Sequence, residues 1–130
     1  MIDRLHCNEY VHLQGQQNLD EVYQNYEAYL AASTSEGFGL TLMEAVGAGL
    51  PIIGFNVRYG NPTFIDNGKN GYLIPVHDRM ERKERVKKLT ERIIRLFTKA
   101  DLEAFRQHSY NKAQKYLTTE VEKKWIDLLD

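Results

Sequence analysis

The sequence is poor in the features that staple, anchor or export a chain. It has a single cysteine, Cys7, which excludes an internal disulfide and any Cys-x-x-Cys redox or zinc site. The longest apolar stretches, such as residues 49–55, are far too short to cross a bilayer, and residues 1–4 begin no signal-peptide hydrophobic region. We therefore expect a soluble, unexported chain in which Cys7 has a packing role.

An excess of charge of one sign is also lacking. Seventeen lysines and arginines face eighteen aspartates and glutamates, for a formal net charge of -1, so the total charge gives no argument for a nucleic-acid partner. With 42% hydrophobic and 11% aromatic residues, the chain has enough apolar material for a buried core. Its 130 residues predict one globular domain, 1–130.

Short apolar runs alternate with helical patterns over the first 75 residues. The runs predict four strands, at residues 10–14, 28–32, 51–55 and 72–74. Helices are predicted at residues 18–27, where Asn18 and Glu21 form a capping box, and at residues 40–46. This order is typical of βα units in a Rossmann-like α/β fold, with a parallel sheet covered by helices on both faces.

After Pro75 the pattern becomes entirely helical. Apolar spacing and caps predict helices at residues 78–97, 101–116 and 119–129. We therefore divide the chain into βα units that carry the ligand site, residues 1–75, and C-terminal helices, residues 76–130. Trp125 is expected to anchor the last helix, with a partly unsupported helix as the alternative.

The loop at residues 33–39 is the place to expect chemistry. Ligands of parallel sheets bind beyond the carboxyl ends of the strands, where loops enter helices. Gly37 and Gly39 stand immediately before the predicted helix, whose first amides point outward at the positive end of the helix dipole. This arrangement suits a phosphate or diphosphate. The third glycine of a dinucleotide fingerprint and the Gly-Lys-Ser/Thr of a P-loop are both absent from this segment.

Two carboxylates flank this predicted anion site. Glu36 lies on the loop and Glu44 about one turn into the helix. Carboxylates only accept hydrogen bonds, so beside an anion they make sense if each grips sugar hydroxyls, which is the layout of a nucleotide sugar. The alternative is that Glu36 is a favourable charge at the dipole and Glu44 a solvated helix residue. On the residues alone the two interpretations weigh about the same.

Residues 36–45, together with residues 49–53, closely resemble the E-x7-E region of the retaining family-four glycosyltransferases of the GT-B fold. The resemblance extends from about His12 to Pro75. Within that family, the segments 33–35 and 59–65 are most similar to two bacterial groups. One group adds α-glucose to poly(glycerol-phosphate) teichoic acid, and the other puts N-acetylglucosamine on serine-rich adhesins during accessory secretion.

The resemblance implies a role for each matching residue. Glu36 is the implied catalytic residue, which contacts the donor-sugar hydroxyls, and Glu44 holds the ribose. The residues implied to bind sugar and diphosphate through their backbone groups are Gly37, Phe38, Gly39, Leu40 and Thr41. Gln16, in the loop 15–17, is implied to lie against the uracil. Two departures from the family pattern, at Ala32-Ser33 and at Thr63, imply a differently built acceptor side.

As a whole, the resemblance implies a partial C-terminal lobe of a GT-B glycosyltransferase. The implied reaction transfers a hexose, glucose or N-acetylglucosamine, from a UDP-sugar donor to a cell-wall polymer or protein acceptor. The basic residues for the diphosphate and the acceptor lobe are expected upstream, so the 130 residues alone are expected to be inactive. The alternative is a non-catalytic glycosyltransferase-like protein that stabilises or recruits an active partner.

The expected surroundings follow from the same resemblance. The expected partners are the UDP-sugar, the acceptor and, as an option, a protein partner subunit. No nucleic acid, cofactor, metal or integral membrane segment is expected, and the location is expected to be cytoplasmic, with peripheral attachment to the inner membrane face as an option.

Several other residues have ordinary structural interpretations. The four histidines are too scattered to indicate a metal site. The basic segment 79–95 suggests a membrane-facing helix, but its i,i+4 acidic-basic pairs favour a solvated helix face. Tyr23, Tyr26 and Tyr29 are expected to pack in the core rather than to stack on sugar.

Overall fold

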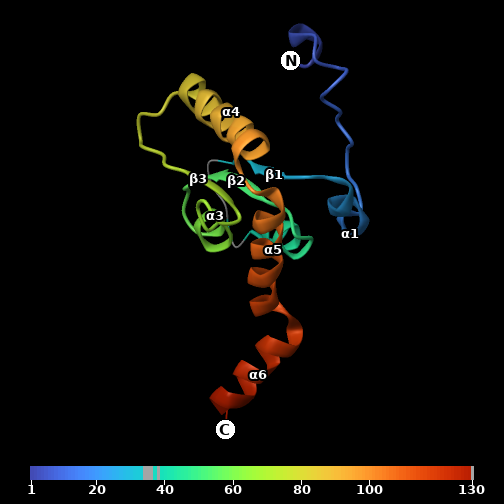
Figure 1. Ribbon diagram of the computed structural model, residues 1–130, viewed down its shortest axis with the longest axis vertical. Coiled ribbons are helices and arrows are strands. Elements are labelled where there is room, and N and C mark those ends of the chain that lie inside the picture. Colours follow the sequence, from blue (N-terminus) through green and yellow to red (C-terminus); the bar gives the residue numbers. More distant parts are fainter. Residues whose placement is uncertain (34–36, 38, 130) are drawn as a thin grey trace.

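A parallel three-stranded sheet lies at the centre of the computed structural model, which describes residues 1–33, 37 and 39–129. Strands β1 (Tyr29–Ala31), β2 (Ile52–Phe55) and β3 (Gly71–Ile74) lie in sequence order, with β2 in the middle (Figure 1). Tyr29 pairs with Ile52, and Ile52 with Gly71. The prediction of a parallel α/β sheet is confirmed for these three strands.

The predicted strand at residues 10–14 is wrong. This segment has no regular secondary structure and runs outside the sheet (Figure 1). Val11 and Leu13 are exposed, and the amides of Tyr10 and Val11 donate to the Cys7 carbonyl oxygen in a local turn. An extended segment is stable only when a neighbouring strand takes up its backbone hydrogen bonds. Strand β1 does not pair with residues 10–14, so their β-rich composition does not make them a strand.

Of the helices before β3, one is shorter than predicted, one agrees with its prediction and the others were not predicted. A 3-10 turn, η1 (Asp3–Leu5), begins the chain. Helix α1 (Leu19–Val22) continues only into the 3-10 turn η2 (Tyr23–Asn25), because Tyr26 has extended backbone angles. Helix α2 (Leu40–Gly47) agrees with its prediction, whereas α3 (Gly60–Phe64) has no predicted counterpart.

The C-terminal helices agree with the predicted order. They are α4 (Arg82–Lys99), α5 (Leu102–Ala113), the 3-10 turn η3 (Gln114–Tyr116) and α6 (Thr118–Leu129). Helix α4 begins four residues late because Met80 closes a turn onto the His77 carbonyl oxygen. Asp101 caps α5 by accepting from the amide of Ala104 at 3.1 Å.

The solvated interpretation of α4 agrees with its ion pairs. Lys88 lies 3.4 Å from Glu84, which is one of the expected i,i+4 pairs. Arg95 lies over the ring of Tyr72, with 5.8 Å from its guanidinium carbon to the ring centroid. Basic side chains of this helix therefore have partners within the chain.

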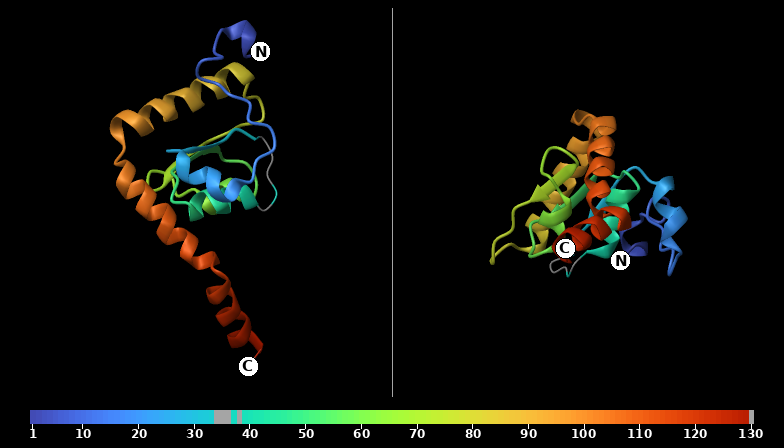
Figure 2. Two further views of the ribbon diagram at one scale, coloured as in Figure 1. Left: turned by 90° about the vertical axis from the view of Figure 1, so that its right-hand side faces the viewer. Right: turned by 90° about the horizontal axis from the view of Figure 1, so that it is seen from below.

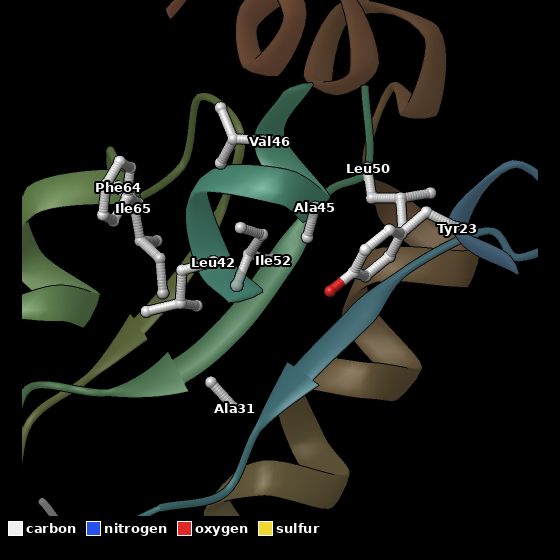
Figure 3. Close-up of a cluster of buried hydrophobic side chains, with 9 residues drawn as sticks. All are labelled: Tyr23, Ala31, Leu42, Ala45, Val46, Leu50, Ile52, Phe64 and Ile65. Atoms are coloured by element: carbon white, nitrogen blue, oxygen red, sulfur yellow. The ribbon is translucent and has the colours of Figure 1, made fainter. Parts of the chain in front are cut away.

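The core has two parts, one on each face of the sheet. Successive residues of β2 point to opposite faces, so Ile52 belongs to one cluster and Ile53 to the other. The first cluster, under α2 and α3, contains Tyr23, Ala31, Leu42, Ala45, Val46, Leu50, Ile52, Phe64 and Ile65 (Figure 3). The second, under α4 and the start of α5, contains Ile53, Phe55, Val57, Tyr72, Ile74, Leu96 and Phe105. Figure 2 shows α4 and α2 on opposite sides of the sheet, as predicted.

The expected anchoring of the last helix by Trp125 is wrong for this chain. Helix α6 extends away from the sheet (Figures 1 and 2), and none of its described residues is buried. Trp125 is 60% exposed, and Leu128 and Leu129 are more so. The helix is amphipathic, but nothing in the described part of the chain covers its apolar side.

Candidate functional site

The candidate site lies where the chain enters α2 after leaving β1. Gly39 is the residue before the helix and has left-handed backbone angles, φ 82° and ψ 52°. A Cβ atom there would lie 2.8 Å from Leu42 Cδ1 and 3.3 Å from the Cα atom of Gly60. Both the turn and this close approach therefore require glycine at position 39.

The first turn of α2 offers backbone amides at this mouth. Met43 N is the first amide of the helix to donate back to Gly39 O, at 3.0 Å. Helix geometry gives the amides of Leu40, Thr41 and Leu42 no acceptor within the helix. Leu40 and Thr41 are exposed, as is Gly37 beside them, so this end of the helix faces solvent. Such an end attracts anions through its amides and its dipole.

Glu44 stands on the same side of α2 as Thr41, because residues three apart on a helix are neighbours. It is exposed, but its Oε2 atom accepts a hydrogen bond of 3.1 Å from the Tyr23 hydroxyl. The same hydroxyl lies 3.3 Å from the carbonyl oxygen of Thr41, and the Tyr29 hydroxyl donates to Thr41 Oγ1 at 3.1 Å. Two tyrosines thus tie the first turns of α2 to the segment before it.

These tyrosine contacts were not predicted. The expected core role is right for Tyr23, which is 8% exposed, and wrong for Tyr26, which is 51% exposed. Tyr29 is half-buried and packs against the first core cluster. The available signal was the polar end of a buried tyrosine, since a phenol hydroxyl in a core requires a partner. Sequence alone does not say which partner it has.

Burial is the main cause of an unusual titration at this site. It raises the pKa of Tyr23 well above its ordinary value, and the hydrogen bond with Glu44 and the negative charge of Glu44 add to the effect. The Tyr23 hydroxyl therefore keeps its proton at physiological pH and acts as a donor to the Glu44 carboxylate.

A cavity of about 390 Å³ adjoins this network. Gly15 and Gln17 contribute to its lining from one side, and Tyr23, Tyr29 and Thr41 from the other. Gln16 itself is exposed within the same loop. The loop that was expected to meet the uracil thus shares a hollow with the start of α2. Figure 3 shows Tyr23 beside Leu50, another residue of the cavity wall.

The structure therefore places Gly39, Leu40, Thr41 and Glu44 at one end of α2, and Gly37 is exposed in the segment before it. The implied catalytic residue Glu36 and the implied donor ligand Phe38 lie outside the described residues. Among the described residues, no group of three or more His, Cys, Asp or Glu side chains is placed to hold a metal ion. The described helices also include none with the length and apolarity that a membrane crossing needs.

Comparison with known proteins places these observations in a family. Residues 1–110 match the family described as glycosyl transferases group 1. The chain is 52% identical over 128 residues to the "UDP-N-acetylglucosamine--peptide N-acetylglucosaminyltransferase GtfA subunit" of Streptococcus gordonii, covering 98% of this chain and 25% of that protein. It is 32% identical over 116 residues to the "Poly(glycerol-phosphate) alpha-glucosyltransferase" of Bacillus subtilis strain 168, covering 87% of this chain and 16% of that protein.

A solved structure agrees in shape as well. The pneumococcal O-GlcNAc transferase GtfA in complex with UDP and GlcNAc superposes with a TM-score of 0.92 at 46% identity, and the match covers 98% of this chain and 25% of that one. The chain thus spans about a quarter of the length of these two streptococcal proteins, which makes it part of a GT-B lobe. The family match, the sequence identity and the shared fold show that this chain belongs to the glycosyl transferases group 1 family.

Proposed function

We propose that these 130 residues form the donor-binding part of a retaining glycosyltransferase that transfers N-acetylglucosamine from a UDP-sugar. The observation that carries the proposal is the start of α2, where first-turn amides that helix geometry leaves without an acceptor in the helix lie one turn from the Glu44 carboxylate. The streptococcal relative at 52% identity is named for UDP-N-acetylglucosamine and peptide, and the Bacillus relative at 32% for glucose and poly(glycerol-phosphate). The greater identity favours N-acetylglucosamine and a protein acceptor over glucose and a cell-wall polymer.

Each part of the donor has a complementary group at this mouth. The diphosphate lies at the amides of Leu40 and Thr41, where the positive end of the helix dipole is not neutralised by an acidic residue in the first turn. The ribose hydroxyls donate to Glu44, and the uracil lies toward the loop that contains Gln16. Glu36 contacts the donor sugar. These are the roles that the family resemblance implies.

In the reaction, the bond between the anomeric carbon and the diphosphate oxygen breaks, and UDP leaves with the electron pair. The acceptor hydroxyl attacks the same face, forms the new glycosidic bond and loses its proton to the departing phosphate oxygen. No obvious nucleophile accompanies Glu36 in the motif, so a front-face substitution fits better than a covalent intermediate. The α2 amides stabilise the charge that develops on the leaving group.

The complete activity depends on groups outside these residues. The basic residues for the diphosphate and the acceptor-binding lobe are expected upstream, so we infer that the chain binds UDP but does not transfer sugar by itself. We also propose that residues 1–75 carry the donor site and that residues 76–130 form the C-terminal helices. The proposed location is cytoplasmic, with peripheral contact to the inner membrane face as an option. The word "subunit" in the name of the Streptococcus gordonii relative supports a protein partner.

A titration with UDP tests the proposal. Glu44→Ala is expected to raise the Kd for UDP about tenfold or more, because hydrogen bonds to a charged group contribute about 1.5–3 kcal/mol each. Glu91→Ala, at an exposed site on α4, is the matched control and is expected to leave the Kd unchanged. Isothermal titration calorimetry gives both values. Equal Kd values for the wild type and Glu44→Ala would refute the ribose role and favour the non-catalytic alternative.

A further inference from the structure

The side chain of Glu44 accepts a hydrogen bond from Tyr23, a residue to which the proposed function assigns no contact with the donor. Tyr23 comes from the 3-10 turn η2, twenty-one residues earlier, and its ring lies in the first core cluster. Its hydroxyl meets two groups of α2, Glu44 Oε2 at 3.1 Å and the Thr41 carbonyl oxygen at 3.3 Å. The buried ring fixes the position of that hydroxyl, since an aromatic side chain has only two rotatable bonds.

Without such a contact, Glu44 would have the rotamer freedom of an exposed helical glutamate. A carboxylate has two oxygens with about four acceptor sites. When Oε2 accepts from Tyr23, Oε1 and the remaining sites stay open to a ligand.

We propose that Tyr23 is a positioning residue, which orients the Glu44 carboxylate toward the ribose hydroxyls of the bound nucleotide. The inference rests on the proposed ribose role of Glu44. It adds that the ribose contact is prepared before the ligand arrives, by a buried hydroxyl from outside the E-x7-E motif. Preorganisation of this kind lowers the ordering cost of binding.

Packing alone does not explain the tyrosine. A phenylalanine would fill the same space beside Leu50 and Ala45, whereas a buried hydroxyl is favourable only when it is hydrogen-bonded. Both of its partners, a carboxylate and a main-chain carbonyl, belong to the first turns of α2. The hydroxyl therefore serves the orientation of this helix end and of Glu44.

The test compares UDP with 2′,3′-dideoxy-UDP, which lacks both ribose hydroxyls, in the full-length chain that carries this sequence. The measured quantity is the Kd for 2′,3′-dideoxy-UDP divided by the Kd for UDP, which is large when the ribose hydroxyls contribute to binding. Tyr23→Phe is expected to lower this ratio about three- to tenfold, because it removes one hydrogen bond and leaves the ring in place. Tyr110→Phe, at an exposed tyrosine of α5, is the matched control and is expected to keep the wild-type ratio. A thermal melt of each variant verifies folding.

The outcomes separate the two proposals. If Tyr23→Phe weakens both nucleotides by the same factor, or neither, the positioning role is overturned, because a purely structural effect does not distinguish the ribose hydroxyls. If Glu44→Ala keeps the wild-type ratio, the ribose role of Glu44 itself fails. In the double variant, Tyr23→Phe is expected to cause no further loss beyond Glu44→Ala. An additive loss in the ratio would also overturn the positioning role.

Discussion

Replacing Gly39 with alanine tests whether the entry to α2 is as tightly built as the structure shows. An alanine at φ 82° has a backbone cost of about 1–2 kcal/mol. Its Cβ atom would also stand 2.8 Å from Leu42 Cδ1, and Leu42 is only 1% exposed, so this side chain must leave its rotamer or shift within the core. Overpacking of this kind costs about 1–3 kcal/mol. We therefore expect Gly39→Ala to lower the free energy of unfolding by about 2–5 kcal/mol.

The matched control is Gly47→Ala, at the other end of the same helix. A Cβ atom at Gly47 would meet nothing within 4 Å, and the backbone there has no positive φ. Alanine in a helix is favoured over glycine, so this change is expected to be neutral or to stabilise the chain by up to about 1 kcal/mol. Urea denaturation followed by circular dichroism measures both variants. If Gly39→Ala were as stable as Gly47→Ala, the close approach of Gly39 to Leu42 and Gly60 would be wrong.

Two further predictions concern regions away from α2. Burial alone would raise the pKa of Asp66. The hydrogen bonds from His108 and Lys112 and their positive charges lower the pKa by more than burial raises it, so the net shift is downward. Because the folded-state pKa is depressed, Asp66 stabilises the chain above its unfolded pKa of about 4, and this contribution is lost as the pH falls through the folded value. Asp66→Asn should therefore lower the free energy of unfolding at pH 7 by less than about 1 kcal/mol, after solvent screening of this partly exposed group. The gap to wild type should shrink as the pH falls below about 4 in urea titrations, and a constant gap would contradict the prediction. Trp125, the only tryptophan, should show the red-shifted, readily quenched fluorescence of an exposed indole, and a blue-shifted emission would show that α6 is covered.

The local sequence pattern was sufficient to predict the strands and helices whose side chains are buried within this chain. The runs at 51–55 and 72–74 are apolar and bounded by turn residues, and both are strands. Helix α2 lies where its helix formers and its glycine stop predict it. The segment 10–14 has an equally β-rich composition, but a strand needs a partner at a sheet edge, and composition does not supply one. Helix α3 was missed because Gly60, Asn61 and Pro62 are typical of turns.

The mouth of α2 was predicted from its glycines, but the support behind it was not. The proposed anion site depends on residues close together in sequence, where helix geometry determines the direction of the amides. Tyr23 and Glu44 are twenty-one positions apart in the sequence, and so are Gly39 and Gly60, which approach closely. Such pairs depend on how β1, α2 and α3 pack, which no periodicity of the sequence expresses.

Those packing contacts have a functional consequence. Helix α2 is fixed by Gly60 at its start, by the tyrosine hydroxyls along its first turns, and by Ser109 of α5, whose hydroxyl donates to the Leu50 carbonyl oxygen at 2.8 Å just beyond its end. Every one of these contacts lies within the 130 residues. These contacts hold α2 from within the 130 residues, whereas the cations for the diphosphate and the acceptor lobe of our proposal come from outside. In our proposal this chain therefore binds UDP by itself, and transfer is expected only when the cations and the acceptor lobe are added.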